Sequence, residues 1–168
     1  MTAILETPRL LLRPPRLSDA GALFEFLGDK EAMRFTHVQS SLRHCRRYIA
    51  LHERQRRTKG CAPWVIVAKT NNAIIGYGGL YDDPFDPGWG IELAYFFSPA
   101  AWGHGYATEF ALGCLNFAET GGRWPEISAF AHPENRRSQA VLSKAGFLRQ
   151  RYVPGMKRDL FLWRSQPR

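Results

Sequence analysis

The first half of the chain contains one short apolar run and two stretches in which apolar residues recur at helical spacing. Residues 10–12 are three leucines followed closely by a pair of prolines, which predicts a first strand. The next stretch begins after Ser18, a suitable N-cap, and we expect its helix to end at Gly28. A longer amphipathic helix is predicted over residues 41–58. Its apolar positions are Leu42, Cys45, Ile49 and His52 or Glu53, and arginines fill many of the others.

The middle of the chain predicts a hairpin, a loop and a further strand. Residues 64–68 and 73–80 are apolar and partly β-branched, and two asparagines lie between them, which is typical of an antiparallel hairpin. Residues 82–90 contain three aspartates, two prolines and two glycines and are therefore a loop. The apolar stretch over residues 91–98 then predicts another strand.

The last third of the chain alternates helices with strands. A glycine-rich turn at residues 102–107 leads into a helix whose apolar stripe covers residues 110–118. Residues 127–131 predict a strand, after which Asn135 caps a short helix that ends at Gly146. Two closing strands follow, over residues 147–153 and 157–163.

These elements amount to about seven strands and four or so helices. Their order predicts a mixed α/β (α+β) fold with a mostly antiparallel, twisted sheet. The 168 residues contain no internal repeat and no low-complexity linker. Residues 1–168 are therefore predicted to form a single domain.

Composition argues against several classes of protein. The chain is 45% hydrophobic and 23% charged, close to the average for globular proteins. No apolar run approaches the roughly 20 residues that cross a bilayer, and residues 1–9 lack the pattern of a secretion signal. Cys45, Cys61 and Cys114 are odd in number and lack metal-binding spacing, so neither disulfides nor a zinc site is supported. We expect a cytoplasmic protein with no membrane partner and with cysteines in its core.

The net charge of +8 is unevenly distributed. Residues 41–60 carry seven basic and one acidic side chain, residues 61–135 carry two and eight, and residues 136–168 carry nine and one. The arginines of residues 43–57 leave open an alternative function as a basic RNA- or ribosome-binding module. Only Tyr48 is interleaved with them and no recognised nucleic-acid motif is present, which argues against this alternative.

The glycine-rich turn at residues 102–107 is a candidate site for a diphosphate. Backbone N–H groups at the start of a helix have no intrahelical partner, and the helix dipole adds positive charge there. Gly103 and Gly105 leave these amides accessible, although two glycines that only make a tight turn would give the same pattern. No P-loop string is present, and the three glycines of residues 76–79 lie in a strand with no helix behind them. The sequence therefore disfavours nucleotide hydrolysis and hydride transfer.

Four stretches of the chain contain motifs that are informative when their order and spacing are considered together. They are residues 5–14 (LETPRLLLRP) followed by Asp19, residues 92–95 (ELAY), residues 102–109 (WGHGYATE), and residues 135–147 with Asn135, Ser138 and the closing KAGF. Together they resemble the GNAT superfamily of acetyl-CoA-dependent N-acetyltransferases, in particular its ribosomal-protein N-terminal serine and alanine acetyltransferases. In the order given, they match that branch's first strand and helix, its fourth strand, its acyl-CoA pyrophosphate loop and its last helix.

The resemblance implies a GNAT fold with splayed central strands four and five, acetyl-CoA as the acyl-donor substrate, and no metal. It assigns Glu92 the role of a base that takes a proton from the attacking amine; otherwise Glu92 is a solvent-facing strand residue. It assigns Ser138 the protonation of the departing thiolate; since a serine hydroxyl is a weak acid, positioning, a water relay or local capping stays open. The residues expected to bind the coenzyme are Tyr95, Phe96, Phe97, Trp102, Gly103, His104, Gly105, Tyr106, Ala107, Thr108, Asn135 and Arg137.

Two positions depart from the family's pattern. Trp102 stands where the family's loop usually begins with Arg or Gln, which matters little because backbone amides bind the phosphates. Leu142 lies where many members have a tyrosine that acts as general acid. That role is therefore filled by another group or omitted, which leaves open an acyl-CoA-binding member without catalysis.

The resemblance also implies an acceptor groove between the second helix and the closing strands. Because the nearby loop contains Asp82, Asp83 and Asp86, we expect a primary amine to approach the acidic loop. A protein N-terminus and a small-molecule amine both fit this expectation. The sequence is compatible with a monomer or a homodimer.

Overall fold

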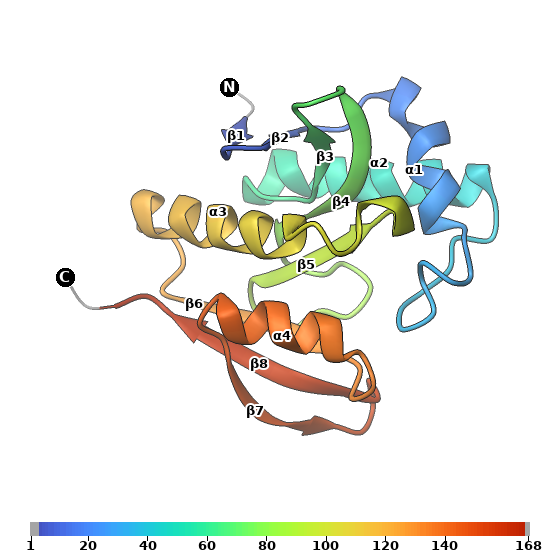
Figure 1. Cartoon of the computed structure of the whole chain (residues 1–168). Coiled ribbons are helices and arrows are strands. Elements are labelled where there is room, and N and C mark those ends of the chain that lie inside the picture. The colour runs from blue at the N-terminus through green and yellow to red at the C-terminus, as the bar shows by residue number, and fades with distance from the viewer. Residues whose placement is uncertain (1–3, 167–168) are drawn as a thin grey trace.

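The structure, a computed structural model, describes residues 4–166, which form eight strands in one open sheet and four α-helices (Figure 1). The strands are β1 (Leu5–Glu6), β2 (Leu10–Arg13), β3 (Trp64–Ala68), β4 (Ala73–Tyr81), β5 (Glu92–Phe97), β6 (Glu126–Ala131), β7 (Leu148–Val153) and β8 (Arg158–Arg164). The α-helices are α1 (Ala20–Leu27), α2 (Leu42–Lys59), α3 (Tyr106–Gly121) and α4 (Arg136–Lys144). Short 3-10 helices at Leu17–Asp19 and Pro99–Ala101 precede α1 and α3.

The sheet has the order β1-β2-β3-β4-β5-β6-β8-β7, and β5 and β6 are its parallel pair. The other neighbouring strands are antiparallel, which confirms the predicted mixed, mostly antiparallel sheet. The sequence did not predict β1, because its two residues are too few to produce a periodic pattern. β1 pairs with β2 through Leu5 opposite Leu12 and Glu6 opposite Leu11.

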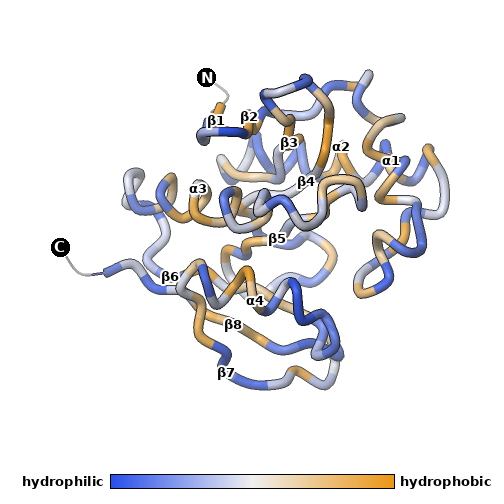
Figure 2. Tube along the Cα trace, in the orientation of Figure 1, coloured by the Kyte–Doolittle hydropathy of each residue, from blue (hydrophilic) through white to orange (hydrophobic). Residues whose placement is uncertain are grey.

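Alternating residues of the central strands pack against two helical layers. In β3, Ile66 belongs to the core that α3 and α4 cover, together with Phe110 and Leu142. Its neighbour Val65 belongs to the core beneath α1 and α2, where Ile49 is also buried. Figure 2 shows hydrophobic segments along the central strands, and Figure 1 shows the sheet between the two pairs of helices. The three cysteines are buried, as expected.

The entry into α1 differs from the prediction that Ser18 caps the helix. A helical turn already begins at Leu17, and the Arg16 amide donates a 2.6 Å hydrogen bond to Asp19 Oδ2. The same carboxylate is held by the Arg13 guanidinium through two bonds of 2.7 and 2.9 Å. A buried carboxylate next to a fixed arginine therefore organises this helix start, and Ser18 lies inside the turn.

No helix within residues 4–166 combines the length and the apolar character needed to cross a bilayer.

Candidate active site

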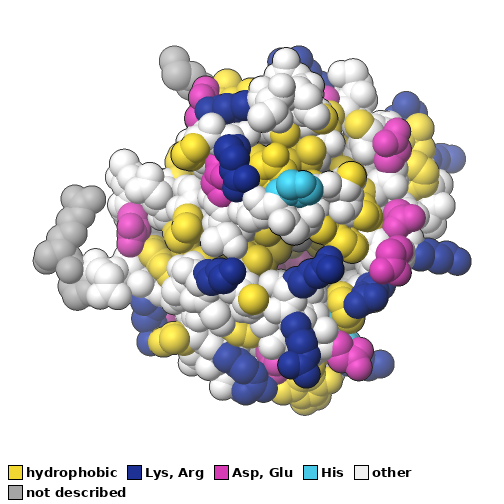
Figure 3. All heavy atoms as spheres, viewed as in Figure 1, with side chains coloured by type: hydrophobic (Ala, Val, Ile, Leu, Met, Phe, Trp, Pro, Cys, Tyr) yellow, Lys and Arg dark blue, Asp and Glu magenta, His cyan; other side chains and the backbone are white. Residues whose placement is uncertain are grey.

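A cavity of about 1310 Å³ is lined by β5, β6, the N-terminal end of α3 and most of α4. Within residues 4–166, β5 and β6 share a single residue pair, Glu92 opposite Ser128. The strands separate beyond this pair, so the predicted splay of the two central strands is confirmed. Residues of α2 and of the segments 31–39 and 81–85 complete the wall. On the face seen in Figure 3, Lys and Arg side chains border a hydrophobic area between α3 and α4.

The glycine turn lies at one end of this cavity and opens directly into α3. Gly103 and Gly105 have φ angles of +78° and +77°, a left-handed conformation that a residue with a Cβ adopts at a cost. Gly105 is the N-cap of α3 and provides no side chain to occupy the first amides of the helix. The turn can therefore present several backbone N–H groups and the positive end of a helix dipole to an anion.

Arg9, at the turn between β1 and β2, holds the glycine turn in place. Its Nε donates to Glu109 Oε2 at 2.6 Å, and its Nη1 donates to the His104 carbonyl oxygen at 2.8 Å. Its guanidinium also lies 4.6 Å from the ring centre of Tyr106. The Glu109 carboxylate in turn accepts bonds of 2.6 Å from the Thr7 hydroxyl and 2.7 Å from the Arg9 amide. These contacts fix the first turn of α3 and place a positive charge beside the glycine turn.

Glu92 is the first residue of β5 and its carboxyl group is buried in the wall of the cavity. The residue is 5% exposed, and its Oε1 has no hydrogen-bond partner among the described residues. Burial, followed by the repulsion of Asp83 and Asp86, raises the pKa of Glu92 to about 8. A carboxyl group with such a pKa exchanges protons near neutral pH, as a general base requires.

Tyr95 on β5 and Ser138 on α4 meet across the cavity. The Tyr95 hydroxyl lies 3.0 Å from Ser138 Oγ and 3.4 Å from the Ser138 carbonyl oxygen. Burial raises the pKa of Tyr95 to about 12, so the phenol keeps its proton at physiological pH. The backbone of β4 approaches closely here, because a Cβ on Gly78 would lie only 2.7 Å from the Tyr95 Cα. The glycine therefore allows β5 to bring Tyr95 to its position.

The start of α4 provides two further predicted residues. Asn135 accepts a 3.2 Å hydrogen bond from the Ser138 amide and is the N-cap of the helix, as expected. The Arg137 guanidinium lies 5.3 Å from the ring centre of Trp102, which brings α4 and the glycine turn together. The side chain of Leu142 has no proton to donate; it is 1% exposed and belongs to the hydrophobic core.

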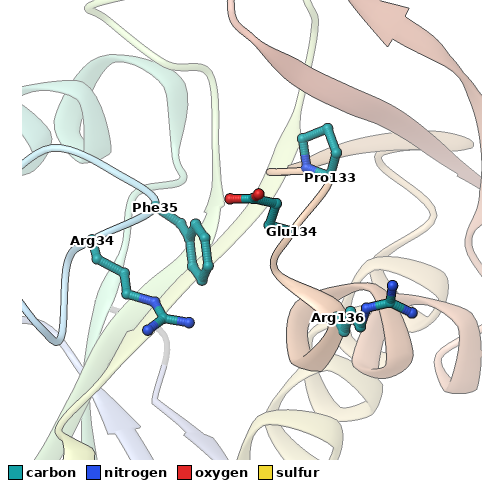
Figure 4. A pocket seen from close by; sticks show the side chains of 5 residues that line it. All are labelled: Arg34, Phe35, Pro133, Glu134 and Arg136. Atoms are coloured by element: carbon teal, nitrogen blue, oxygen red, sulfur yellow. The ribbon is translucent and has the colours of Figure 1, made fainter.

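A smaller cavity of about 640 Å³ adjoins the start of α4 (Figure 4). Its lining residues are Arg34, Phe35, Pro133, Glu134 and Arg136. The Phe35 ring stacks on His132 with 5.1 Å between ring centres, which links the segment before α2 to the end of β6. Arg136 lines both cavities.

Most predicted site residues are brought together around the larger cavity. Its lining includes Glu92, Tyr95, Phe96, Phe97, Trp102, Gly103, Gly105, Tyr106, Ala107, Thr108, Asn135, Arg137 and Ser138. His104 is not part of this lining; its ring stacks on Tyr106 and its Nδ1 lies 3.3 Å from the Ala101 carbonyl oxygen. The residues that sequence reasoning missed are the Tyr95 hydroxyl as a partner of Ser138, Arg9 beside the turn, and the aromatic residues Tyr48, Tyr81 and Phe85.

Within residues 4–166, no group of three or more His, Cys, Asp and Glu side chains could hold a metal ion. The basic helix α2 does not present all of its charge to solvent. Arg56 forms an ion pair of 2.9 Å with Glu53, and Lys59 pairs with Asp82. Arg47 lines the cavity, and other arginines of α2 are exposed.

Comparison with known proteins identifies the family. The model of the acetyltransferase (GNAT) domain matches residues 9–148, and this chain therefore belongs to the GNAT acetyltransferase family. The uncharacterised protein YkkB of Bacillus subtilis (strain 168) is 27% identical over 143 residues, which cover 84% of this chain and 83% of YkkB.

Two solved structures share the fold. An acetyltransferase from Agrobacterium tumefaciens str. C58 superposes with a TM-score of 0.84 at 21% identity, covering 98% of this chain and 96% of its own. RimL, a ribosomal L7/L12 α-N-protein acetyltransferase solved with coenzyme A, superposes with a TM-score of 0.79 at 15% identity, covering 96% and 98%. The predicted fold, with a ribosomal-protein acetyltransferase among its structural neighbours, is therefore confirmed.

Proposed function

We propose that this protein is an acetyl-CoA-dependent N-acetyltransferase that transfers the acetyl group to a primary amine by direct attack in a ternary complex. The observation that carries the proposal is that one cavity is lined by both the glycine turn at α3 and the buried Glu92 carboxyl group. An anion site and a proton acceptor in one cavity suit a reaction between a phosphate-bearing thioester and an amine. That RimL was solved with coenzyme A supports the choice of donor.

The two helix starts bind the coenzyme. The backbone amides of residues 103–108 hold its diphosphate at the positive end of α3. Arg137, stacked near Trp102, adds a phosphate contact, and the side chain of Asn135 hydrogen-bonds the pantetheine arm. The arm lies between β5 and β6, where the separated strands leave backbone groups free to bond it.

Glu92 prepares the amine for attack. Its carboxylate accepts a proton from the ammonium form of the acceptor, directly or through a water molecule, and the neutral nitrogen then attacks the thioester carbonyl carbon. The new C–N bond forms and the C–S bond breaks, with the electron pair of the C–S bond leaving on sulfur. The nitrogen loses its second proton to Glu92, which passes each proton to solvent.

Ser138 and Tyr95 return a proton to the leaving group. Ser138 Oγ–H donates to the thiolate sulfur, and the Tyr95 hydroxyl, 3.0 Å away, replaces the serine proton. A phenol is a stronger acid than an aliphatic hydroxyl, so the tyrosine makes the serine a more effective donor. Tyr95 regains its proton from solvent, and one proton is released in each turnover. Ser138 and Tyr95 thus act as the general acid, a role that the side chain of Leu142 cannot fill.

The proposal is tested by the release of free thiol from acetyl-CoA in the presence of a broad panel of amines. Glu92→Gln is expected to lower kcat by about 10²-fold and Gly105→Ala to weaken binding of coenzyme A. The proposal fails if the wild-type protein is neither stabilised by coenzyme A nor releases thiol with any amine. Coenzyme binding without turnover would instead indicate a non-catalytic member of the family. Salt-sensitive RNA binding that persists in Gly105→Ala would favour the RNA-binding alternative.

A further inference from the structure

Aromatic side chains line the cavity on the side of α2. The rings of Tyr48 on α2 and Phe85 on the loop after β4 stack with 5.7 Å between their centres and 22° between their planes. Tyr81, at the end of β4, completes this group, and all three residues line the cavity beside Glu92. Phe85 is 57% exposed, so much of its surface is free to contact a bound molecule. We name Tyr48, Tyr81 and Phe85 the aromatic wall.

The aromatic wall is supported from behind by His52. The His52 ring lies 4.4 Å from the ring centre of Tyr48 and 5.3 Å from that of Tyr81, edge-on to both. His52 is fully buried, and its Nδ1 lies 2.9 Å from the Tyr77 hydroxyl. Burial and the nearby Arg56 lower the pKa of His52 to about 3, so the ring is neutral. The rings are therefore held in one arrangement by an uncharged support.

The loop that contains Phe85 is fixed onto α2 and carries a carboxylate into the cavity. Lys59 forms an ion pair with Asp82, and the Gln55 side chain donates to the Asp82 carbonyl oxygen. Asp83 accepts a 2.8 Å hydrogen bond from the Phe85 amide. Asp83 is one of the residues that line the cavity together with Glu92, whereas Asp86 is not. Of the three aspartates in the acidic loop, one is paired with a lysine and one faces the cavity.

Two arginines that line the cavity limit the other charges that the acceptor can carry. Arg158 on β8 lines the same cavity, and its Nη2 lies 3.5 Å from the Phe35 carbonyl oxygen. Arg47 of α2 lines it as well. An ammonium group near Glu92 and Asp83 is attracted, but a second cation on the same molecule is repelled by these two arginines.

We propose that the acceptor is a monoamine whose amino group is close to an aromatic or bulky apolar group. The amino group lies toward Glu92 and Asp83, and the apolar group packs against the aromatic wall. Burial of apolar surface against rigid rings favours such an acceptor over a small one, and the ring faces also attract the ammonium group. This inference rests on the proposed acetyl transfer and specifies its substrate class.

An acceptor panel tests the inference through thiol release from acetyl-CoA. We expect kcat/KM for 2-phenylethylamine to exceed that for propylamine by at least about tenfold, since burial of a phenyl group is worth a few kcal/mol. Phenylalanine amide should exceed alanine amide similarly, and 1,4-diaminobutane should be a poor substrate. The panel also compares kcat/KM for peptides that begin with phenylalanine with kcat/KM for the free amines. A higher value for the peptides indicates a protein N-terminus as the acceptor, and a higher value for the free amines indicates a small molecule. Equal kcat/KM values across the panel would overturn the inference.

Matched variants locate the preference. Phe85→Ala is expected to lower kcat/KM for the phenyl compounds at least about tenfold more than kcat/KM for propylamine, and Leu148→Ala, at an exposed position of β7, should change neither. Asp83→Asn should raise KM for all amines severalfold, whereas Asp86→Asn should not. If Phe85→Ala lowers kcat/KM for all amines equally, the aromatic wall does not bind the acceptor. If the wild-type protein turned over none of the amines, the acetyltransferase function itself would be refuted, and this outcome is distinguishable from a lack of preference among the amines.

Discussion

The Tyr95 hydroxyl on β5 lies 3.0 Å from Ser138 Oγ on α4, although 43 residues separate them in the chain. Both residues line the cavity, and the contact crosses from the sheet to the helix at the gap between β5 and β6. Asn135 fixes the Ser138 amide at the start of the helix, and Gly78 admits the backbone of Tyr95. Two hydroxyl groups are thereby held in contact at the place where the proposed reaction releases a thiolate.

If these hydroxyls act in series, removing either one slows the reaction and removing both has little further effect. We expect Tyr95→Phe to lower kcat by about tenfold and Ser138→Ala by about 10²-fold, with little change in KM for acetyl-CoA. The double variant should be no slower than Ser138→Ala, because Tyr95 acts through the serine. The kcat values of the three variants are measured by steady-state kinetics, and the participation of the two hydroxyls in proton transfer is measured by the solvent deuterium isotope effect on kcat.

Tyr152→Phe, at an exposed position of β7, is the control for loss of a phenol and should behave as wild type. A purely structural role for the Tyr95–Ser138 contact predicts something else. The melting temperature and coenzyme affinity would then fall, while the isotope effect on kcat would stay unchanged. Multiplicative losses in the double variant would show that the two hydroxyls act independently.

The sequence predicted the elements better than the contacts between them. Periodicity and turn residues identified the hairpin, the glycine turn and the short helix capped by Asn135, because these patterns are local. The Ser18 cap was wrong because the side chain of Asp19, held by Arg13 at the end of β2, organises that helix start in its place. Nothing in the sequence distinguishes Phe85 from the other residues of its polar loop, because its contact with Tyr48 is formed by packing. Contacts made by tertiary packing leave no periodic pattern in the sequence.

Glu92 determines the pH dependence expected for the reaction. Because burial raises its pKa to about 8, the carboxylate form that accepts a proton becomes populated as the pH rises through that value. We therefore expect kcat/KM to rise from pH 6 to pH 9 with a group near 8. In Glu92→Gln this limb should be absent and the remaining activity should follow only the ionisation of the amine. A wild-type profile unchanged by the substitution would exclude Glu92 as the base.

The same carboxyl group also makes stability depend on pH. The pKa of Glu92 is about 8 in the folded protein against an ordinary value of 4.5, so the folded state holds the proton more tightly. The free energy of unfolding therefore falls as the pH rises from 4.5 to 8, by about 1.4 kcal/mol for each pH unit contributed by this group. Glu92→Gln should remove this slope and stabilise the protein at pH 9. Urea unfolding of both proteins at pH 5 and pH 9 gives the comparison, and parallel curves would contradict it.

Gly105 should be required for coenzyme binding and not only for stability. Its φ angle of +77° makes Gly105→Ala cost about 1–2 kcal/mol of folding free energy. Gly122 at the other end of α3 has a φ angle of +59° and provides a matched control, since Gly122→Ala costs a similar amount. Only Gly105→Ala is expected to weaken coenzyme A binding, by about tenfold or more, in calorimetric titration. Equal affinities of the two variants would show that the turn does not contact the coenzyme.

Glu109 should contribute far more to stability than an ordinary surface ion pair. Its side chain is 15% exposed and accepts three hydrogen bonds, from Thr7 and from two groups of Arg9. Glu109→Ala leaves these donors without their acceptor and should cost about 1–3 kcal/mol, with weaker coenzyme binding because the first turn of α3 loses its support. Glu126 pairs with Arg164 at 2.8 Å, but their side chains are 50% and 72% exposed, so Glu126→Ala should cost about 0–1 kcal/mol. Urea unfolding of the two variants at neutral pH separates these expectations. A loss in Glu109→Ala no greater than in Glu126→Ala would mean that the contacts between Arg9 and α3 do not stabilise the glycine turn.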